Sequence, residues 1–196
     1  RSTLFPYTTL FRSRDASDFI TCYHPFGQSK KEIRYRLTDS FCQFHLNFID
    51  GQSITDTAYW QHNQNKPQLN TWRGFTFEQV CFNHVSQIKR ALGVENVVSS
   101  ESAWIVRGDE DHKGAQIDML IVRDDRVVNL CEMKFLSKEY DPKADDDTKL
   151  RARIATLQEH LSPKQTIHLT LVTTVGLKHN AHSGIFQQTV TIGSLF

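Results

Sequence analysis

Two apolar, β-branched runs lie between Gln116 and Phe135 and are separated by the polar segment Asp124-Asp125-Arg126. Such runs around turn-forming residues predict a β-hairpin. A hairpin centred on Asp125 predicts the cross-strand pairs Val122–Val128, Leu120–Leu130, Asp118–Glu132 and Gln116–Lys134. We expect the rest of the chain to fold around this hairpin.

Side chains along a strand alternate between two faces. One face of the predicted hairpin carries Gln116, Asp118, Glu132 and Lys134, and the other carries Ile117, Met119, Ile121, Cys131, Met133 and Phe135. Two carboxylates directly opposite each other lie ~4.5–5.5 Å apart and destabilise a sheet. The Asp118–Glu132 pair therefore favours a divalent cation with oxygen ligands, as Mg²⁺ prefers. The alternative is a solvated strand edge, where Glu132 pairs with Lys134 or Arg123.

The E-x-K spacing places Lys134 two residues beyond Glu132 on the same face. A cation beside a metal site can polarise a scissile phosphate or help to deprotonate water. This spacing strengthens the metal hypothesis for the hairpin.

Further elements follow from periodicity and capping residues. Strands are predicted over 19–26, 32–39, 97–106, 166–175 and 188–192. A first helix is predicted after the cap Asp39-Ser40, with Phe41, Phe44 and Phe48 as its apolar stripe. A second is predicted from Trp72 to Gly93, with an apolar stripe of Phe77, Cys81, His84 and Ile88. A third is predicted after Asp145-Asp146-Asp147, with Leu150, Ile154, Leu157 and Leu161 buried and Lys149, Arg151 and Arg153 facing outward. The order of helix, three strands, helix and strand predicts an α/β core.

Two helical side chains and one loop are further candidates. Glu78 lies on the flank of the buried stripe, and a buried carboxylate requires a cation or a metal. A salt bridge is the alternative for Glu78, and His84 is expected to be a hydrogen-bonded core histidine. In the loop, His179 and Asn180 are expected to fix the backbone, with a phosphate contact as the alternative.

The predicted hairpin near the N-terminus is basic. Lys30, Lys31, Arg34 and Arg36 against Glu32 give a local charge of +3. Such a hairpin can contact nucleic-acid phosphates, or it can be a solvated or domain-facing surface.

Composition narrows the function classes. A 39% hydrophobic content and a net charge of +1 indicate a folded protein without a global preference for nucleic acid. The chain has no apolar run of ~18 residues, so no membrane partner is expected. Its four cysteines form no zinc or disulfide pattern, which predicts reduced thiols and a cytoplasmic location. A P-loop motif is missing from the sequence, so ATP binding of that kind is excluded for this chain.

Asp118 followed by Glu132-Met133-Lys134 resembles the signature of the restriction-endonuclease-like PD-(D/E)XK superfamily. The segments WRGFTFEQVCFNHVSQIKRALG, KGAQIDMLIVRDD, VNLCEMKF, IHLTLVTTVGLKHNAHSG and the terminal SLF resemble the C-terminal part of a bacterial and archaeal family of AAA-type ATPases. The resemblance covers about residues 17 to 196. It implies a restriction-endonuclease-like core preceded by a partial winged helix, and it places Glu78 at the edge of the metal site.

The resemblance and the composition together predict four segments. Residues 1–13 resemble the translation of a sequencing-library adapter and are excluded from the fold, an apolar N-terminal strand being the alternative. Residues 14–50 are expected to be a partial winged helix, 51–71 a linker with a short helix near 55–61, and 72–196 the nuclease-like domain. An upstream ATPase domain is expected to be missing.

The sequence therefore predicts a Mg²⁺- or Mn²⁺-dependent DNA endonuclease domain. Asp118, Glu132 and the Met133 carbonyl are the expected metal ligands, with Glu78 as a further acidic ligand and Lys134 as the catalytic cation. The alternative is a catalytically silent nuclease-fold module that binds DNA or its ATPase. A purely regulatory winged-helix protein is a third possibility, although most of the chain lies outside the wing.

Overall fold

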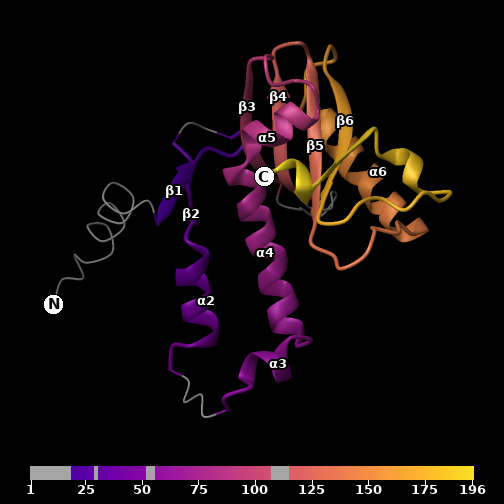
Figure 1. The fold of residues 1–196 in the computed structure, drawn as a ribbon. Coiled ribbons are helices and arrows are strands. Elements are labelled where there is room, and N and C mark those ends of the chain that lie inside the picture. The colour runs from indigo at the N-terminus through magenta and orange to yellow at the C-terminus, as the bar shows by residue number, and fades with distance from the viewer. Residues whose placement is uncertain (1–18, 29–30, 52–55, 107–114) are drawn as a thin grey trace, which may run out of the picture. The chain divides into compact units, whose positions relative to one another are not determined.

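The computed structural model describes residues 19–28, 31–51, 56–106 and 115–196 (Figure 1). The predicted adapter segment 1–13 and Lys30 lie outside these ranges. The chain forms two compact units, each described below by itself. The first unit comprises Arg1–His24 and Ser29–Gln79, and the second comprises Pro25–Gln28 and Val80–Phe196.

The first unit contains the predicted hairpin and helix. Strand β1 (Ile20–Tyr23) pairs antiparallel with β2 (Arg34–Leu37). Helix α2 (Ser40–Phe48) begins after Asp39, whose carboxylate accepts hydrogen bonds from the amides of Phe41 (3.2 Å) and Cys42 (3.0 Å). This confirms the predicted cap, because such a side chain satisfies amides that have no partner within the helix.

The apolar stripe of α2 is only partly as predicted. Phe48 is buried, but Phe41 is 66% exposed, so its assignment to the stripe is wrong. The aromatic partners explain the difference, because they gather at the C-terminal half of the helix. Ring centroids lie 4.7 Å apart for Phe44 and Trp60 and 5.9 Å apart for Phe48 and Trp72.

The helix predicted from Trp72 to Gly93 begins earlier than predicted and is divided into two helices. A short helix, α3 (Tyr59–Asn63), is followed by α4 (Pro67–Asn83), which begins five residues before Trp72. Proline suits this start because a first-turn amide needs no partner within the helix. The predicted single helix breaks at His84, whose Nδ1 lies 2.7 Å from the Val80 carbonyl, and it resumes as α5 (Val85–Ala91).

The second unit is built on a five-stranded mixed sheet with the order β3-β4-β5-β6-β7 (Figure 1). Its strands are β3 (Ser99–Val106), β4 (Ala115–Arg123), β5 (Val127–Lys134), β6 (Thr166–Thr173) and β7 (Gln188–Thr191). The first three are antiparallel, and β5, β6 and β7 are parallel. Helix α6 (Ala144–Glu159) connects β5 to β6, and the short 3₁₀ helices Ser183–Ile185 and Ile192–Ser194 flank β7. The described residues therefore confirm a mixed α/β class.

Strands β4 and β5 form the predicted central hairpin. Four pairs, from Met119–Cys131 to Val122–Val128, have the predicted register. The turn is closed by a hydrogen bond from the Arg126 amide to the Arg123 carbonyl (3.2 Å), and Arg126 has a positive φ of 70°. The predicted ladder pairs Asp118–Glu132 and Gln116–Lys134 are wrong, because the pairing stops at Met119.

A β-bulge in β4 accounts for this difference. Ser102 pairs with Leu120 and Trp104 pairs with Ile117, so Asp118 and Met119 together stand opposite the single residue between Ser102 and Trp104. A bulge adds one residue and shifts the alternation of side chains beyond it. Ile117 consequently packs in one cluster with Leu120, and its predicted place on the opposite face is wrong.

Helix α6 packs on one face of the sheet, and apolar side chains fill the interface. Its buried residues join those of the strands in a cluster of Trp104, Leu120, Val128, Leu130, Leu150, Leu157, Leu169 and Leu171. The opposite face carries Cys131, whose pKa is raised by burial and, to a smaller extent, by the neighbouring Cys81 thiol of α4. Lys89 of α5 also pairs with Glu101 of β3 at 3.6 Å. Helices therefore cover both faces of the sheet.

The first turn of α6 has the predicted acidic residues, Asp145, Asp146 and Asp147. Asp146 accepts a hydrogen bond from the Lys143 amide at 2.9 Å, which closes the start of the helix. All four cysteines are free thiols. Within the described ranges, no helix combines the length and the apolar character that crossing a bilayer requires.

The packing of α6 can be tested by cavity formation. Leu157 is fully buried, so Leu157→Ala should lower the free energy of unfolding by about 2–5 kcal/mol. Urea denaturation followed by circular dichroism measures this loss. Lys149→Ala, on the exposed side of the same helix, should change stability by less than ~0.5 kcal/mol. Equal losses in the two variants would contradict the packing described.

Candidate metal and phosphate site

The candidate site lies at the end of β5 and is centred on Glu132. Its side chain is only 6% exposed and has two cationic partners. The ammonium of Lys134 lies 2.7 Å from Oε1, and the guanidinium of Arg153 lies 2.6 Å from Oε2. A buried carboxylate needs such neutralisation, since its transfer from water without a partner is costly.

Asp118 lies beside this group through the bulge of β4. Its Oδ2 accepts a hydrogen bond of 3.3 Å from the Met133 amide. Burial and, next, the negative charge of Glu132 raise the pKa of Asp118 to about 6, against the opposing effects of that hydrogen bond and of Lys134 and Arg153. The two carboxylates are thus close enough to interact, although they do not pair across the ladder.

Three of the predicted site residues therefore come together in the second unit. Asp118, Glu132 and Lys134 converge, and the backbone of Met133 lies between the last two on β5. Among the described residues, no group of three or more histidine, cysteine or acidic side chains is arranged to hold a metal. The available oxygen donors are two carboxylates, with the Met133 carbonyl as the predicted third ligand.

Arg153 is the residue that the sequence pattern placed wrongly. It was expected on the outer side of α6, yet its guanidinium contacts Glu132. Lys149 and Arg151 do have exposed side chains, which pair with Asp145 (2.6 Å) and Asp147 (3.0 Å). The difference arises because Arg153 lies three residues after Leu150 and four before Leu157, both buried, which places it at the edge of the buried face. A long side chain at the border of a buried stripe can reach inward.

Two further polar groups near the site were not anticipated. Thr173 is fully buried and pairs in register with Lys134, and its hydroxyl has no hydrogen-bond partner in the described part of the chain. Tyr140 precedes α6, and burial followed by the charges of Asp146 and Glu132 raises the pKa of its hydroxyl. The only sequence signal for Thr173 was its place as a polar residue at the end of an apolar strand, which lies beside the E-x-K strand.

The remaining predicted site residues belong to the first unit. Glu78 is half-buried and lines a cavity with Arg36, Gln43, Phe75 and Gln79. Arg36 also lies over the ring of Tyr23, at 5.1 Å from its centroid. Metal binding by Glu78 and phosphate contacts by Lys31, Arg34 and Arg36 remain predictions.

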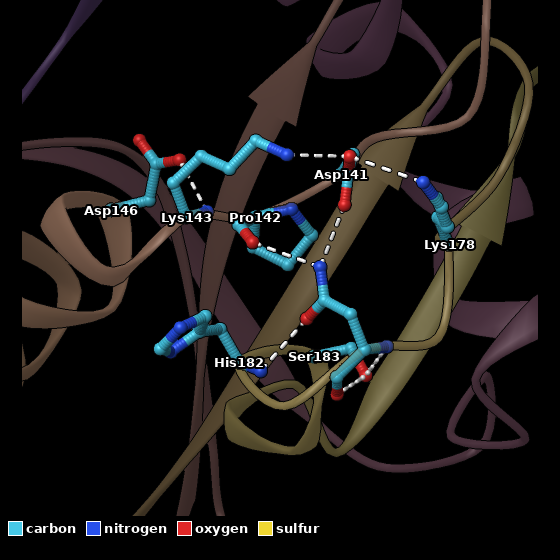
Figure 2. Close-up of polar contacts among 8 residues, drawn as sticks. Asp141, Pro142, Lys143, Asp146, Lys178, His182 and Ser183 are labelled. Carbon is cyan, nitrogen blue, oxygen red and sulfur yellow. Dashed lines mark hydrogen bonds and ion pairs between the residues drawn. The ribbon is translucent and has the colours of Figure 1, made fainter.

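A polar network ties the segment before α6 to the loop after β6 (Figure 2). The amide of Asn180 donates to Oδ1 of Asp141 (2.7 Å) and to the Pro142 carbonyl (2.9 Å), and its oxygen accepts from the His182 amide (2.7 Å). Hydrogen bonds from Lys143 and Asn180, followed by one from Lys178, lower the pKa of Asp141 to about 2. This confirms the loop-fixing role predicted for Asn180, whereas that of His179 stays a prediction.

No protein-family model matches this chain, and no curated protein matches it. One similar structure is a crystal structure of AF1548, a protein of unknown function, with 18% sequence identity and a TM-score of 0.39. The match covers 57% of this chain and 56% of that one, so the chain spans about half the length of its match. A likeness of this size carries no argument about activity.

The raised pKa of Asp118 predicts a pH-dependent stability difference. Because its pKa is about 6 in the folded protein against an ordinary 3.8, the stability linked to this group is present below about pH 4 and is lost as the pH rises through 6. Asp118→Asn should therefore be more stable than the original chain by about 2 kcal/mol at pH 8, after allowance for partial solvation, and equally stable near pH 4. Urea titrations in EDTA measure this. Asp125→Asn, which removes a carboxylate of lowered pKa, should give no gain at pH 8.

The polar network predicts a cost for losing Asn180. Asn180→Ala removes three hydrogen bonds and leaves partly buried groups without partners, so stability should fall by about 2 kcal/mol. Thermal unfolding checks this value. Lys178→Ala, which removes only the exposed 3.3 Å contact to Asp141, should cost less than ~1 kcal/mol. A larger loss for Lys178 would show that the network rests on its exposed ion pairs.

Proposed function

We propose that the second unit is a restriction-endonuclease-like domain that hydrolyses phosphodiester bonds in DNA with Mg²⁺ or Mn²⁺. The observation that carries this proposal is the meeting of Asp118, Glu132 and Lys134 at the end of β5. A protein that holds two interacting carboxylates in a largely buried place gains stability from a cation between them. The mixed sheet, with parallel strands β5 and β6 joined by α6, supports the same reading.

The donor chemistry fits a divalent cation of the Mg²⁺ class. Asp118 and Glu132 would supply two carboxylates, and the Met133 carbonyl would supply a third oxygen. Such hard oxygen donors suit Mg²⁺, which also keeps several waters and so needs only a few protein ligands. The sequence resemblance implies Glu78 as a further acidic ligand through water, and this role stays a prediction.

The side chains would divide the work of hydrolysis. Lys134, held by Glu132, would neutralise charge on the scissile phosphate and orient the attacking water. Asp118 would be ionised above its pKa of about 6 and so able to bind the cation at neutral pH. A bound divalent cation supplies Lewis-acid stabilisation of the negative charge that develops on the phosphate.

The proposed setting of this activity follows the sequence resemblance. The DNA would be held in part by the basic hairpin of the first unit, through Lys30, Lys31, Arg34 and Arg36. The domain would act with an AAA-type ATPase domain of the full-length chain, in the cytoplasm. The DNA contact of the basic hairpin and the ATPase partner are separate from the metal site, so evidence against either would leave the metal site unchanged.

A second candidate function rests on Arg153. The guanidinium and the ammonium already neutralise Glu132, so this carboxylate needs no metal ion to balance its charge. A nuclease-fold module without catalysis, used to bind DNA or the ATPase, would retain this arrangement. Only the metal dependence of DNA cleavage separates the two candidates.

Plasmid nicking by the purified full chain, with Mg²⁺ or Mn²⁺ and with EDTA, tests the proposal. Asp118→Asn and Lys134→Ala should each lower the cleavage rate by about 100-fold or more, since each removes stabilisation of the developing charge. Lys149→Ala is the control, because that lysine is exposed and pairs only with Asp145 within the described residues.

Circular dichroism spectra should be unchanged in all three variants. Cleavage that persists in both site variants would rule out this site. Absence of metal-dependent cleavage by the original chain would favour the silent module.

A further inference from the structure

Both carboxylate oxygens of Glu132 are taken by cations, and this sets a condition on any ion that binds there. Oε1 lies 2.7 Å from the Lys134 ammonium, and Oε2 lies 2.6 Å from the Arg153 guanidinium. With its side chain only 6% exposed, Glu132 has no open side toward solvent. A divalent cation that uses Glu132 must therefore share it with, or displace, one of these partners.

The two partners differ in how they are held. Lys134 lies two residues along the same strand, so its ammonium stays near Glu132 whichever oxygen it contacts. Arg153 reaches across from α6, and its long side chain is 34% exposed, against 36% for Lys134, so the two partners differ in the element that carries them and not in exposure. Its guanidinium can swing toward water without any movement of the sheet or the helix. Arg153 is the partner that can leave.

An incoming cation would also interact with Asp118, whose carboxyl group senses the charge of Glu132. The charges of Lys134 and Arg153 both act on Asp118, so the two carboxylates and the guanidinium share one electrostatic environment. A doubly charged ion between the carboxylates would be attracted by both and repelled by the cations of Lys134 and Arg153. Repulsion between like charges is strong at a poorly solvated site, because little water screens them.

We propose that Arg153 is a positioning residue that competes with the divalent cation for Glu132 and thereby sets the affinity of the site for metal. The inference rests on the proposed metal site of Asp118 and Glu132. With the guanidinium bound, Glu132 is neutralised and held in place; with the cation bound, the guanidinium is released toward solvent. Arg153 thus neutralises the buried carboxylate of Glu132, and the same contact lowers the affinity of the site for metal.

Isothermal titration of Mn²⁺ into the full chain at pH 7.5, without DNA, tests the competition. Arg153→Gln should bind Mn²⁺ about tenfold more tightly than the original chain, since a charge-assisted contact no longer has to be broken. Arg153→Lys keeps the charge but loses the planar fork and should tighten binding by about threefold. Arg151→Gln removes the same charge two residues away, from an exposed side chain that pairs with Asp147, and should stay within about twofold.

Glu132→Gln separates the inference from the proposed function. If Glu132→Gln abolishes Mn²⁺ binding while both Arg153 variants bind like the original chain or more weakly, the metal site stands and the competition is overturned. If neither the original chain nor any Arg153 variant binds Mn²⁺, the proposed metal site fails and the competition fails with it. If Arg153→Gln binds Mn²⁺ and the original chain does not, the result supports competition so strong that Arg153 blocks the site. Arg153→Lys carries the test if Arg153→Gln fails to fold in thermal unfolding controls.

Discussion

The structure depends on one electrostatic constraint, the presence of two interacting carboxylates at the buried end of β5. Glu132 is almost fully enclosed and takes a cation on each oxygen, and the pKa of Asp118 is raised to about 6 by burial and by Glu132. A hydrophobic core does not tolerate such charges unless they are paired. Lys134 and Arg153 satisfy this need from two different elements, which ties β5 to α6 through charge as well as packing.

The fold produces this meeting through two irregular features. The bulge at Asp118 and Met119 breaks the ladder between β4 and β5, and it lets the Asp118 carboxylate accept from the Met133 amide. Helix α6 crosses between parallel strands and packs on the sheet, which carries Arg153 to Glu132. Bulges commonly re-aim side chains in this way next to active sites.

The sequence predicts the regular part of this arrangement well. Alternation and turn residues placed the central hairpin in its observed register from Met119 to Val122, and Asp39 was identified as the cap of α2. Alternation could not reveal the bulge, because one extra residue leaves no mark in an apolar run. Arg153 was assigned outward by its charge, although its spacing from Leu150 and Leu157 places it at the edge of the buried face, where a long side chain can reach inward. The convergence of Asp118, Glu132 and Lys134 was therefore foreseen, although the geometry that produces it was not.

The central claim is that Asp118 and Glu132 bind one divalent ion jointly, and anomalous diffraction from Mn²⁺-soaked crystals tests it most directly. The account predicts one strong anomalous peak within about 2.3 Å of an oxygen of each carboxylate, with the Arg153 guanidinium withdrawn from Oε2. Crystals with Mn²⁺ bound elsewhere, or with no peak and the Arg153–Glu132 ion pair intact, would contradict it. In that case the second unit would be a folded α/β domain in which Glu132 is neutralised by Lys134 and Arg153 alone.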